Sequence, residues 1–412
     1  MNREPSALPL AGIRVLELGR WYAAPWASQM LADLGAEVIK VESQQGDPMR
    51  QSGFLVSEAI VRDGEGNPTS DHSSFITHNR NKSCLVVDLG NPEGQKLVRD
   101  LAATADVFIE NFKPGDLARR GLDYAAISKI NPEIIYLSLS GYGQTGPYRE
   151  KPAMDGVAQA FTGFASLIGP ASVPPSLSPV PVCDFAAGMY AAVALLGALY
   201  GRDAAGGKGQ HIDLALIEAG LGLMSLGIVP HLLTGKAPER GRLEPLGAPN
   251  VFQAQDGYLY IGVNQDEAFK VLCEAAGLPD LPGDPRFSTF AARLANGPAM
   301  IEEVSRGLAH YTRAEWVQIL EPAGLLCTPV NRIEDVVNDP HVIDRGMIRQ
   351  IPHVAGGTIP VVRNPIRYSE TPLERFESPR LLGQDTAEVL SKLLGVDSAE
   401  VDRLRASGAF GR

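Results

Sequence analysis

A single carboxylate, Asp184, stands near the start of an apolar stretch, residues 179–202, with the sequence PVPVCDFAAGMYAAVALLGALYGR. No charged residue follows it until Arg202. An Asp in this position can cap a helix, because its side chain accepts backbone N–H groups and its charge suits the positive helix end. It can also attack a carbonyl carbon and form an acyl intermediate. The small residues 186–188 leave room for a substrate, so both interpretations remain open and are compatible.

Other nucleophiles and metal sites have weaker signals. Cys183 is beside Asp184, but no His lies near it in sequence, and a small buried Cys is the commoner state. GxSxG is absent, since SLSGYG lacks the first glycine. The seven His residues form neither HxxxH nor HExxH, so we expect no metal site and interpret His72 and His78 as ordinary polar residues.

Composition and charge narrow the class of protein. The 412 residues suggest two or three domains, and 44% hydrophobic with 21% charged residues is typical of a globular chain. A net charge of -11 argues against a nucleic-acid partner. The four Cys residues are far apart and form no CxxC, which favours free thiols in a reducing, cytoplasmic compartment.

No membrane segment is expected. The N-terminus, MNREPSALPLAG, lacks the pattern of a secretory signal. The most apolar run extends from Phe185 to Gly201, which is 17 residues and shorter than the roughly 20 that span a bilayer. We therefore expect a buried core helix.

The first part of the chain alternates between strand and helix patterns. Ala27, Met30, Leu31 and Leu34 repeat at i, i+3, i+4, i+7, which predicts one apolar helix face. This alternation predicts a mainly parallel sheet covered by helices. The expected strands are 13–18, 37–42, 84–89, 106–111 and 134–140, with helices starting near 25, at 92–104 and at 123–131.

The second half changes character after a Pro- and Ser-rich linker, GPASVPPSLSPVPV. Helices are expected at 184–201 and 215–234, a hairpin near Asp256-Gly257, helices near 266–276, 298–310 and 313–323, and two final helices at 386–394 and 398–406. We predict a large α/β domain, 1–225 and 340–412, and a small α+β domain with linkers, 226–339.

Candidate ligand-binding residues follow the strands. Trp21 and Tyr22 are expected at the edge where open α/β sheets bind ligands, and they could pack on a ligand or equally belong to the core. The turn LGRWYAAP lacks GxGxxG. Glu42 resembles a ribose-binding acid, but a structural carboxylate is the better interpretation. Lys113, Arg119 and Arg120, joined by Arg80 and Lys82, form either a phosphate-binding cluster or a solvated turn.

Together these segments resemble the class III CoA-transferases, which include formyl-CoA:oxalate and carnitine CoA-transferases, with alpha-methylacyl-CoA racemase as a relative. The resemblance rests on GIRVLELGRWYAAPWASQMLADLGAEVIKVE, NRNKSCLVVDL, DVFIENFKPGDLARRGL, LSLSGYGQTGPYREKPAMDGVAQAFTG, CDFAAGMYAAVALLGALYGRDAAGGKGQHIDLAL and DPRFSTFAARLAN. These motifs occur in order from about Leu8 to the C-terminus.

The resemblance implies a Rossmann-like sheet domain, a smaller domain and an interlocked homodimer. It implies that CoA thioesters are substrates, with no permanently bound cofactor, and that Asp184 is the nucleophile. An acyl-aspartyl anhydride, an aspartyl-CoA thioester and exchange with an acceptor acid would follow. The positions that match CoA-site residues are Trp21, Tyr22, Ala23, Val87, Asn111, Phe112, Lys113, Arg119, Arg120, Ala153, Met154 and Asp155.

Three departures bear on the reaction. Racemases of the family have a His where this chain has Met154, which cannot exchange a proton, so transfer is favoured over racemisation. Formyl-CoA transferase has a run of glycines in a loop that closes over its intermediates. The segment expected to match it here, EPLGAPN, 244–250, has only Gly247. Where formyl-CoA transferase has an Arg that contacts adenosine, this chain has Ser43. The expectation is a CoA-transferase using small dicarboxylates such as succinate; a 2-methylacyl-CoA racemase and a non-catalytic CoA-thioester binding protein are the alternatives.

Overall fold

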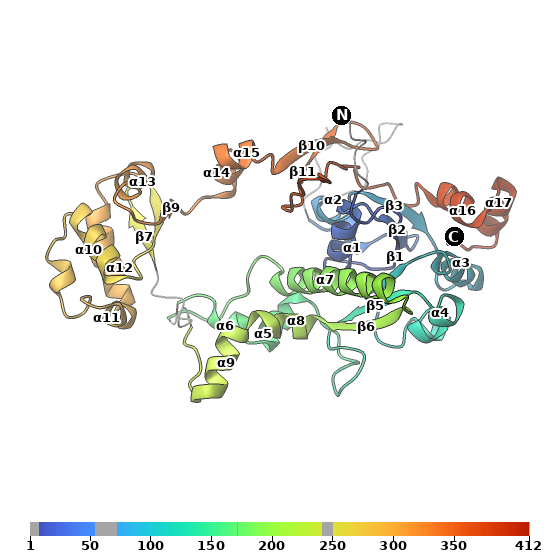
Figure 1. The fold of residues 1–412 in the computed structure, drawn as a ribbon, viewed down its shortest axis with the longest axis horizontal. Helices are drawn as coiled ribbons and strands as arrows, with labels where there is room; N and C mark the ends of the chain where they lie inside the picture. Colours follow the sequence, from blue (N-terminus) through green and yellow to red (C-terminus); the bar gives the residue numbers. More distant parts are fainter. Residues whose placement is uncertain (1–7, 54–71, 171, 241–249, 412) are drawn as a thin grey trace. The chain divides into compact units, whose positions relative to one another are not determined.

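The computed structural model describes residues 8–53, 72–170, 172–240 and 250–411 (Figure 1). These residues form two compact units. Unit 1 contains residues up to 162, 178–223 and 344–412, and unit 2 contains 163–177 and 224–343. The linker predicted at 169–182 is thus shared between the units, with residues 163–177 packing with unit 2.

Unit 1 is built on a six-stranded parallel sheet in the order β3-β2-β1-β4-β5-β6 (Figure 1). The order reverses between β1 and β4, and ligands of such sheets bind outside the carboxyl ends of the strands at this switch point. The mainly parallel sheet predicted from the alternating pattern is confirmed. The strands are β1 (Arg14–Glu17), β2 (Glu37–Glu42), β3 (Lys82–Val86), β4 (Val107–Glu110), β5 (Ile135–Ser140) and β6 (Gln210–Ala215).

The two faces of the sheet carry separate cores, because successive strand residues point to opposite sides. Val15 and Val107 face a core formed with α1 (Ala23–Asp33), α7 (Val182–Ala205) and α8 (Leu216–Leu223). Leu16 and Phe108 face the other core. That core includes residues of α3 (Pro92–Ala102), α16 (Thr386–Leu394) and α17 (Ser398–Ala406), and α4 (Tyr124–Ile130). The remaining elements of unit 1 are α2 (Ser73–His78), α5 (Asp155–Phe161), β10 (Ile348–Pro352) and β11 (Thr358–Val362).

Unit 2 contains an antiparallel three-stranded sheet in the order β7-β8-β9. The predicted hairpin at Asp256-Gly257 is confirmed as β7 and β8. Its strands are β7 (Val251–Ala254), β8 (Gly257–Ile261) and β9 (Cys327–Pro329). Its helices are α6 (Phe164–Leu167), α9 (Ser225–Thr234), α10 (Asp266–Ala275), α11 (Phe290–Ala295), α12 (Gly297–Leu308), α13 (Arg313–Leu320) and α14 (Ile333–Val337), with α15 (Pro340–Asp344) at the boundary.

Three expectations for individual elements are wrong. β3 begins at Lys82 and ends at Val86, earlier than the 84–89 predicted from its apolar letters. The single helix expected at 215–234 is two helices, α8 and α9, in a glycine-rich sequence of low helix propensity. The apolar helix is longer than expected: α7 has 24 residues, and it is long and apolar enough to cross a membrane. Half of its most apolar window is buried in this structure, as in a core helix.

Candidate active site

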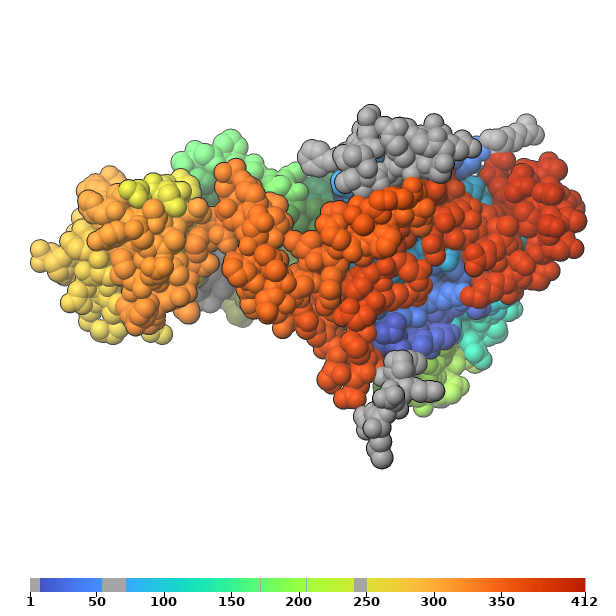
Figure 2. All heavy atoms as spheres, turned by 90° about the horizontal axis from the view of Figure 1, so that it is seen from above, coloured from blue at the N-terminus to red at the C-terminus, as the bar shows by residue number. Residues whose placement is uncertain are grey.

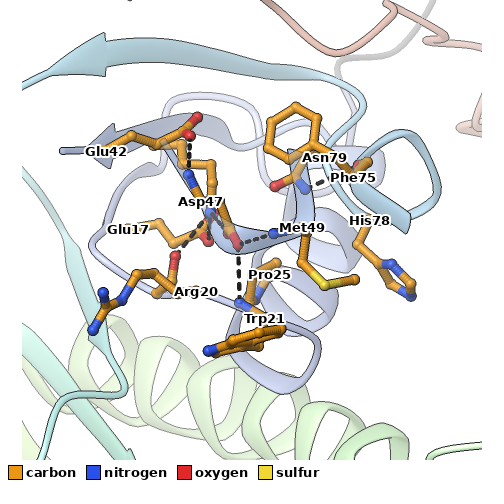
Figure 3. Close-up of polar contacts among 12 residues, drawn as sticks. Glu17, Arg20, Trp21, Pro25, Glu42, Asp47, Met49, Phe75, His78 and Asn79 are labelled. Atoms are coloured by element: carbon orange, nitrogen blue, oxygen red, sulfur yellow. Dashed lines mark hydrogen bonds and ion pairs between the residues drawn. The ribbon is translucent and has the colours of Figure 1, made fainter. Parts of the chain in front are cut away.

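The turn between β1 and α1 lies at the switch point and holds Trp21 in an uncommon conformation. Trp21 has a φ of 66°, which non-glycine residues rarely adopt, and its side chain is 50% exposed. Its backbone N–H donates to Asp47 Oδ1 at 3.2 Å, and the same oxygen accepts the N–H of Met49 at 3.0 Å (Figure 3). The backbone N–H of Asp47 donates to Glu42 Oε2 at 2.7 Å. These bonds fix the turn while the indole stays at the surface.

The same turn is joined to the end of β4. Arg20 donates its backbone N–H to Asn111 Oδ1 at 2.9 Å, and Asn111 Nδ2 donates to the Arg20 carbonyl at 2.7 Å. The Arg20 guanidinium lies 5.0 Å from the centre of the Phe112 ring. The structure therefore places Trp21, Asn111 and Phe112, which the sequence predicted as CoA contacts, together at the switch point.

A buried network of charges supports this turn from the sheet side. Glu17 is fully buried and accepts Lys40 Nζ at 3.0 Å and Lys82 Nζ at 2.9 Å. Lys40 also pairs with Asp47 at 3.0 Å and donates to the Gly19 carbonyl at 2.8 Å. Lys82 was grouped with a phosphate-binding cluster, and this prediction is wrong, because its ammonium is used inside the protein.

Arg80 and Glu42 are also structural. Arg80 is buried and its guanidinium holds both carboxylate oxygens of Asp33, at 2.9 and 2.6 Å. Glu42 is buried and receives Arg50 on both oxygens, at 2.9 and 2.8 Å. Arg80 is therefore not available for a phosphate, and the interpretation of Glu42 as a structural carboxylate is confirmed.

The remaining cations lie at the surface of the β4–α4 segment. Lys113 is exposed and lines a cavity of about 240 Å³ that Glu110 also lines. Arg119 is exposed and pairs with Asp116, and Arg120 donates to the Asp116 carbonyl at 2.7 Å. Their accessibility fits either a phosphate cluster or a solvated turn, and their CoA-binding role stays a prediction.

Asp184 is not the cap of α7. The helix begins at Val182, so Asp184 lies within its first turn and its own side chain caps no N–H. Instead, Asp155 at the start of α5 accepts the backbone N–H groups of Cys183 at 2.8 Å and Asp184 at 3.3 Å. The capping interpretation of Asp184 is wrong, because a second carboxylate from another helix fills that position.

The surroundings of Asp184 hold its acid group in an unusual state. Burial, and then the negative charge of Asp155, raise the pKa of Asp184 to about 7. The neighbouring Cys183 is fully buried, and burial raises the pKa of its thiol to about 12. A thiol that stays protonated is a poor nucleophile, so Asp184 is the reactive candidate of this pair.

An aromatic cluster lies beside Asp184, and sequence analysis missed it. The His78 ring stacks on Phe185, with centroids 5.6 Å apart, and contacts Tyr22 and Trp26 edge-on at 5.2 and 5.5 Å. Tyr22 lies 6.3 Å from Phe185. Burial lowers the pKa of His78 to about 4, so the ring is neutral at ordinary pH. The cluster connects the Trp21 turn with the residue after Asp184, and no local sequence pattern indicates this.

Three other predicted residues are placed as follows. Val87 is buried in the core on the α3 side of the sheet, which leaves its CoA contact a prediction. Ala153 is partly buried against Gly141, where an added Cβ would lie 2.5 Å from the Ala153 Cβ. Met154 precedes α5 and is 71% exposed. The glycine-loop correspondence at 244–250 lies almost wholly outside the described residues.

Comparisons with known proteins show the family of the chain. CoA-transferase family III matches residues 10–386. The chain is 39% identical over 396 residues to succinate–glutarate CoA-transferase of Agrobacterium fabrum, covering 95% of this chain and 96% of that protein. It is 34% identical to succinyl-CoA:glutarate CoA-transferase of Mus musculus, covering 98% and 91%.

A solved structure shares the fold. The crystal structure of a CAIB/BAIF family protein from Brucella suis superposes with a TM-score of 0.83 and 36% sequence identity, covering 94% of this chain and 100% of that one. The match covers nearly the whole length of this chain. The chain is an enzyme that belongs to CoA-transferase family III.

Proposed function

We propose that this CoA-transferase moves CoA from succinyl-CoA to a small dicarboxylic acid, with Asp184 as the covalent nucleophile. The observation that carries the proposal is the half-buried carboxylate of Asp184, with its pKa raised to about 7, beside small residues in the first turn of α7. A carboxylate of this basicity is a stronger nucleophile than an ordinary Asp, and about half of it is ionised at pH 7.

The reaction passes through an anhydride of Asp184 with the donor acyl group, then an aspartyl-CoA thioester, and then an anhydride with the acceptor acyl group. An Asp184 oxygen attacks the thioester carbonyl of the donor, the C–S bond breaks, and CoA leaves as a thiolate. The thiolate attacks the Asp184 carbonyl of the anhydride and releases the donor as a carboxylate. The acceptor carboxylate then attacks this aspartyl thioester, and the released thiolate takes the acceptor acyl group, which restores Asp184. Each step exchanges one anion for another, so no proton is required.

The substrates are inferred from the relatives. The Agrobacterium fabrum and Mus musculus proteins act on succinate or succinyl-CoA and glutarate by their names, and another relative, from Chloroflexus aurantiacus, on D-citramalate. We therefore assign succinyl-CoA as donor and a dicarboxylate of similar length as acceptor. Arg149 and Lys151, which shortly precede Asp155 in the sequence, are candidates to hold the distal carboxylate of a dicarboxylic acid. Arg149 pairs with Glu150 and Lys151 lies on the Tyr148 ring, so both cations are already engaged.

CoA itself is assigned to the switch point, where Trp21, Tyr22, Ala23, Asn111 and Phe112 come together, with Lys113, Arg119 and Arg120 for its phosphates. The proposed CoA site is also lined by Val87, and the wall near the reacting acyl group is formed by Ala153, Met154 and Asp155. The exposure of Lys113 and Arg119 supports this assignment.

The proposed assembly is a cytoplasmic homodimer without a membrane or nucleic-acid partner. Met189, Tyr190, Val193 and Tyr200 of α7 are exposed, although the opposite face of this helix is in the core. Such an apolar face suits a second copy of the chain. Light scattering of the purified protein tests this assembly.

Racemisation is disfavoured by Met154, whose thioether exchanges no proton. A racemase would exchange the alpha proton of a 2-methylacyl-CoA with heavy water, whereas a transferase would not. Tight CoA binding without acyl exchange would instead identify a binding protein.

The deciding experiment is mass spectrometry after incubation with succinyl-CoA, followed by hydroxylamine or borohydride. We expect a modification confined to the peptide that contains Asp184, absent in Asp184→Asn. Asp203→Asn is the control, since Asp203 is an exposed residue of the same helix paired with Arg202. An adduct in Asp184→Asn, or full turnover by that variant, would contradict the proposal.

A further inference from the structure

Four arginines gather at the open end of the β10–β11 hairpin in unit 1. Arg349 is on β10 opposite Val361, and Arg363 directly follows β11, where its backbone N–H donates to the Met347 carbonyl at 2.9 Å. The guanidinium of Arg367 donates to the carbonyl of Arg345. We call Arg345, Arg349, Arg363 and Arg367 the guanidinium cluster. Figure 2 shows the segment after α15, in orange to red, at the surface of unit 1.

The cluster has too little negative charge around it. Within the described residues, Glu374 is the one carboxylate that pairs with any of the four, and it does so loosely, at 3.6 Å from Arg349 and 3.5 Å from Arg363. Four positive charges therefore face one negative charge. The pKa of Arg367 is lowered, first by desolvation and then by the charges of Arg345, Arg363 and Arg349. Arginines this close repel one another unless an anion lies between them.

One member of the cluster is buried. Arg363 is 5% exposed, and its Nε is buried with no hydrogen-bond partner in the described part of the chain. A buried N–H without a partner is unfavourable, especially on a charged group. Arg345, Arg349 and Arg367 are exposed around it. The arrangement has a buried base and an accessible rim, as a small ligand site requires.

The cluster is distinct from the candidate active site. Arg80, which pairs with Asp33, donates to the Val362 carbonyl at 2.9 Å, and Asn364 lies 3.5 Å from Asp33. Asp33 is the last residue of α1, whereas the Trp21 turn precedes the first residue of the same helix. The 11 residues of α1 separate these two ends by about 16 Å. The cluster thus lies near the amino edge of the sheet, away from Asp184.

We propose that the guanidinium cluster is a second anion-binding site, for a small molecule whose oxygen atoms carry two negative charges. Arginine forks bind carboxylate and phosphate oxygens in a bidentate manner, and these two groups share the required chemistry. A dianion offsets two of the three positive charges that Glu374 leaves uncompensated and offers an acceptor to the Arg363 Nε. A dicarboxylate and a phosphate are the two possible sources of such a dianion.

The test uses the full-length protein and measures binding by calorimetry and thermal unfolding. Inorganic phosphate and succinate are separate arms, each compared with sodium chloride at the same ionic strength, since a ligand of the native state raises its melting temperature. The variants Arg367→Gln and Arg345→Gln alter exposed residues and leave the buried Arg363 in place. Arg405→Gln is the matched control, because Arg405 is an exposed residue of α17 in unit 1 paired with Asp402.

We expect one of the two dianions to bind, and each cluster variant to weaken its affinity by about tenfold or more, as for loss of one charge-assisted bond. The control variant should bind within about twofold of wild type. Succinate bound near Asp184 would be unaffected by Arg367→Gln, so it would not imitate this result. The proposal is overturned if neither dianion exceeds chloride, if the variants bind equally, or if they change only the oligomeric state.

Discussion

Asp155 accepts a hydrogen bond from the backbone of Asp184, and its negative charge disfavours the ionised form of the Asp184 side chain. One carboxylate oxygen of Asp155 accepts the N–H groups of Cys183 and Asp184, at 2.8 and 3.3 Å, while its charge contributes to the raised pKa of Asp184. The same residue therefore positions the proposed nucleophile and increases its basicity. This relationship makes the two effects separable by substitution.

The first prediction concerns the acid limb of the pH–rate profile. We expect kcat/KM to fall about tenfold per pH unit below about 7, as Asp184 becomes protonated. Asp155→Asn keeps an oxygen acceptor for the helix N–H groups but removes the charge. Its limb should move to lower pH while staying above the ordinary Asp value, because burial is the larger cause of the shift.

The Asp155→Asn variant also distinguishes Asp184 from two other titratable groups. His78, with its pKa lowered to about 4 by burial, does not titrate near pH 7. Burial raises the pKa of Glu110 to about 7, but the charges that act on it are those of Asp116 and Asp213. A limb that does not move in Asp155→Asn would therefore contradict its assignment to Asp184 and leave Glu110 as a candidate.

The second prediction concerns stability against pH. The folded pKa of Asp184 is above its unfolded value, so the protonated form stabilises the fold below about pH 4, and this contribution is lost as the pH rises through 7. The free energy of unfolding of wild type minus that of Asp184→Asn should fall by up to about 4 kcal/mol between pH 4 and 7. Urea unfolding at several pH values measures it, and a difference that stays constant would contradict the raised pKa.

The sheet could be predicted from the sequence, because strand and helix periods are local patterns, and the isolated acid in an apolar run made Asp184 a candidate for the nucleophile. The contacts of Asp184 could not. Asp155 is 29 positions away, and it reaches α7 only because α5 packs beside that helix. The same applies to His78, whose neighbours come from α1, the turn before it, and α7.

The basic residues show more clearly what a local sequence pattern cannot predict. Lys82, Arg80, Lys113 and Arg119 have similar sequence surroundings, with polar neighbours near a strand. The first two are buried against Glu17 and Asp33, which lie 65 and 47 positions away, and the last two are exposed. Whether a cation is used inside the fold or offered to a ligand depends on these distant carboxylates, so the sequence could not separate the two pairs.

The third prediction tests the network beneath the Trp21 turn. Glu17→Gln removes the charge that holds Lys40 and Lys82, leaving two buried ammonium groups poorly compensated. Loss of one partner of a buried pair costs about 3–5 kcal/mol of stability. Asp100→Asn is the control, since it breaks an exposed pair with Lys96 worth about 0–1 kcal/mol. Equal midpoints of urea unfolding for the two variants would refute the structural role of the network.

The last prediction tests the close contact of α1 with α7. At Gly188, an added Cβ would lie 2.7 Å from Trp26 Cδ1 and 2.9 Å from the Ala23 carbonyl oxygen. Gly188→Ala should therefore push the two helices apart, lower stability by about 1–3 kcal/mol as overpacking does, and reduce kcat by displacing Asp184 from the Trp21 turn. Gly201→Ala in the same helix meets no atom within 4 Å, so it should instead be neutral or raise stability by up to about 1 kcal/mol. Thermal unfolding and turnover are measured for both variants. Because both add one methyl group to α7, a similar loss in the two would show that helix composition, and not the contact at Gly188, limits the site.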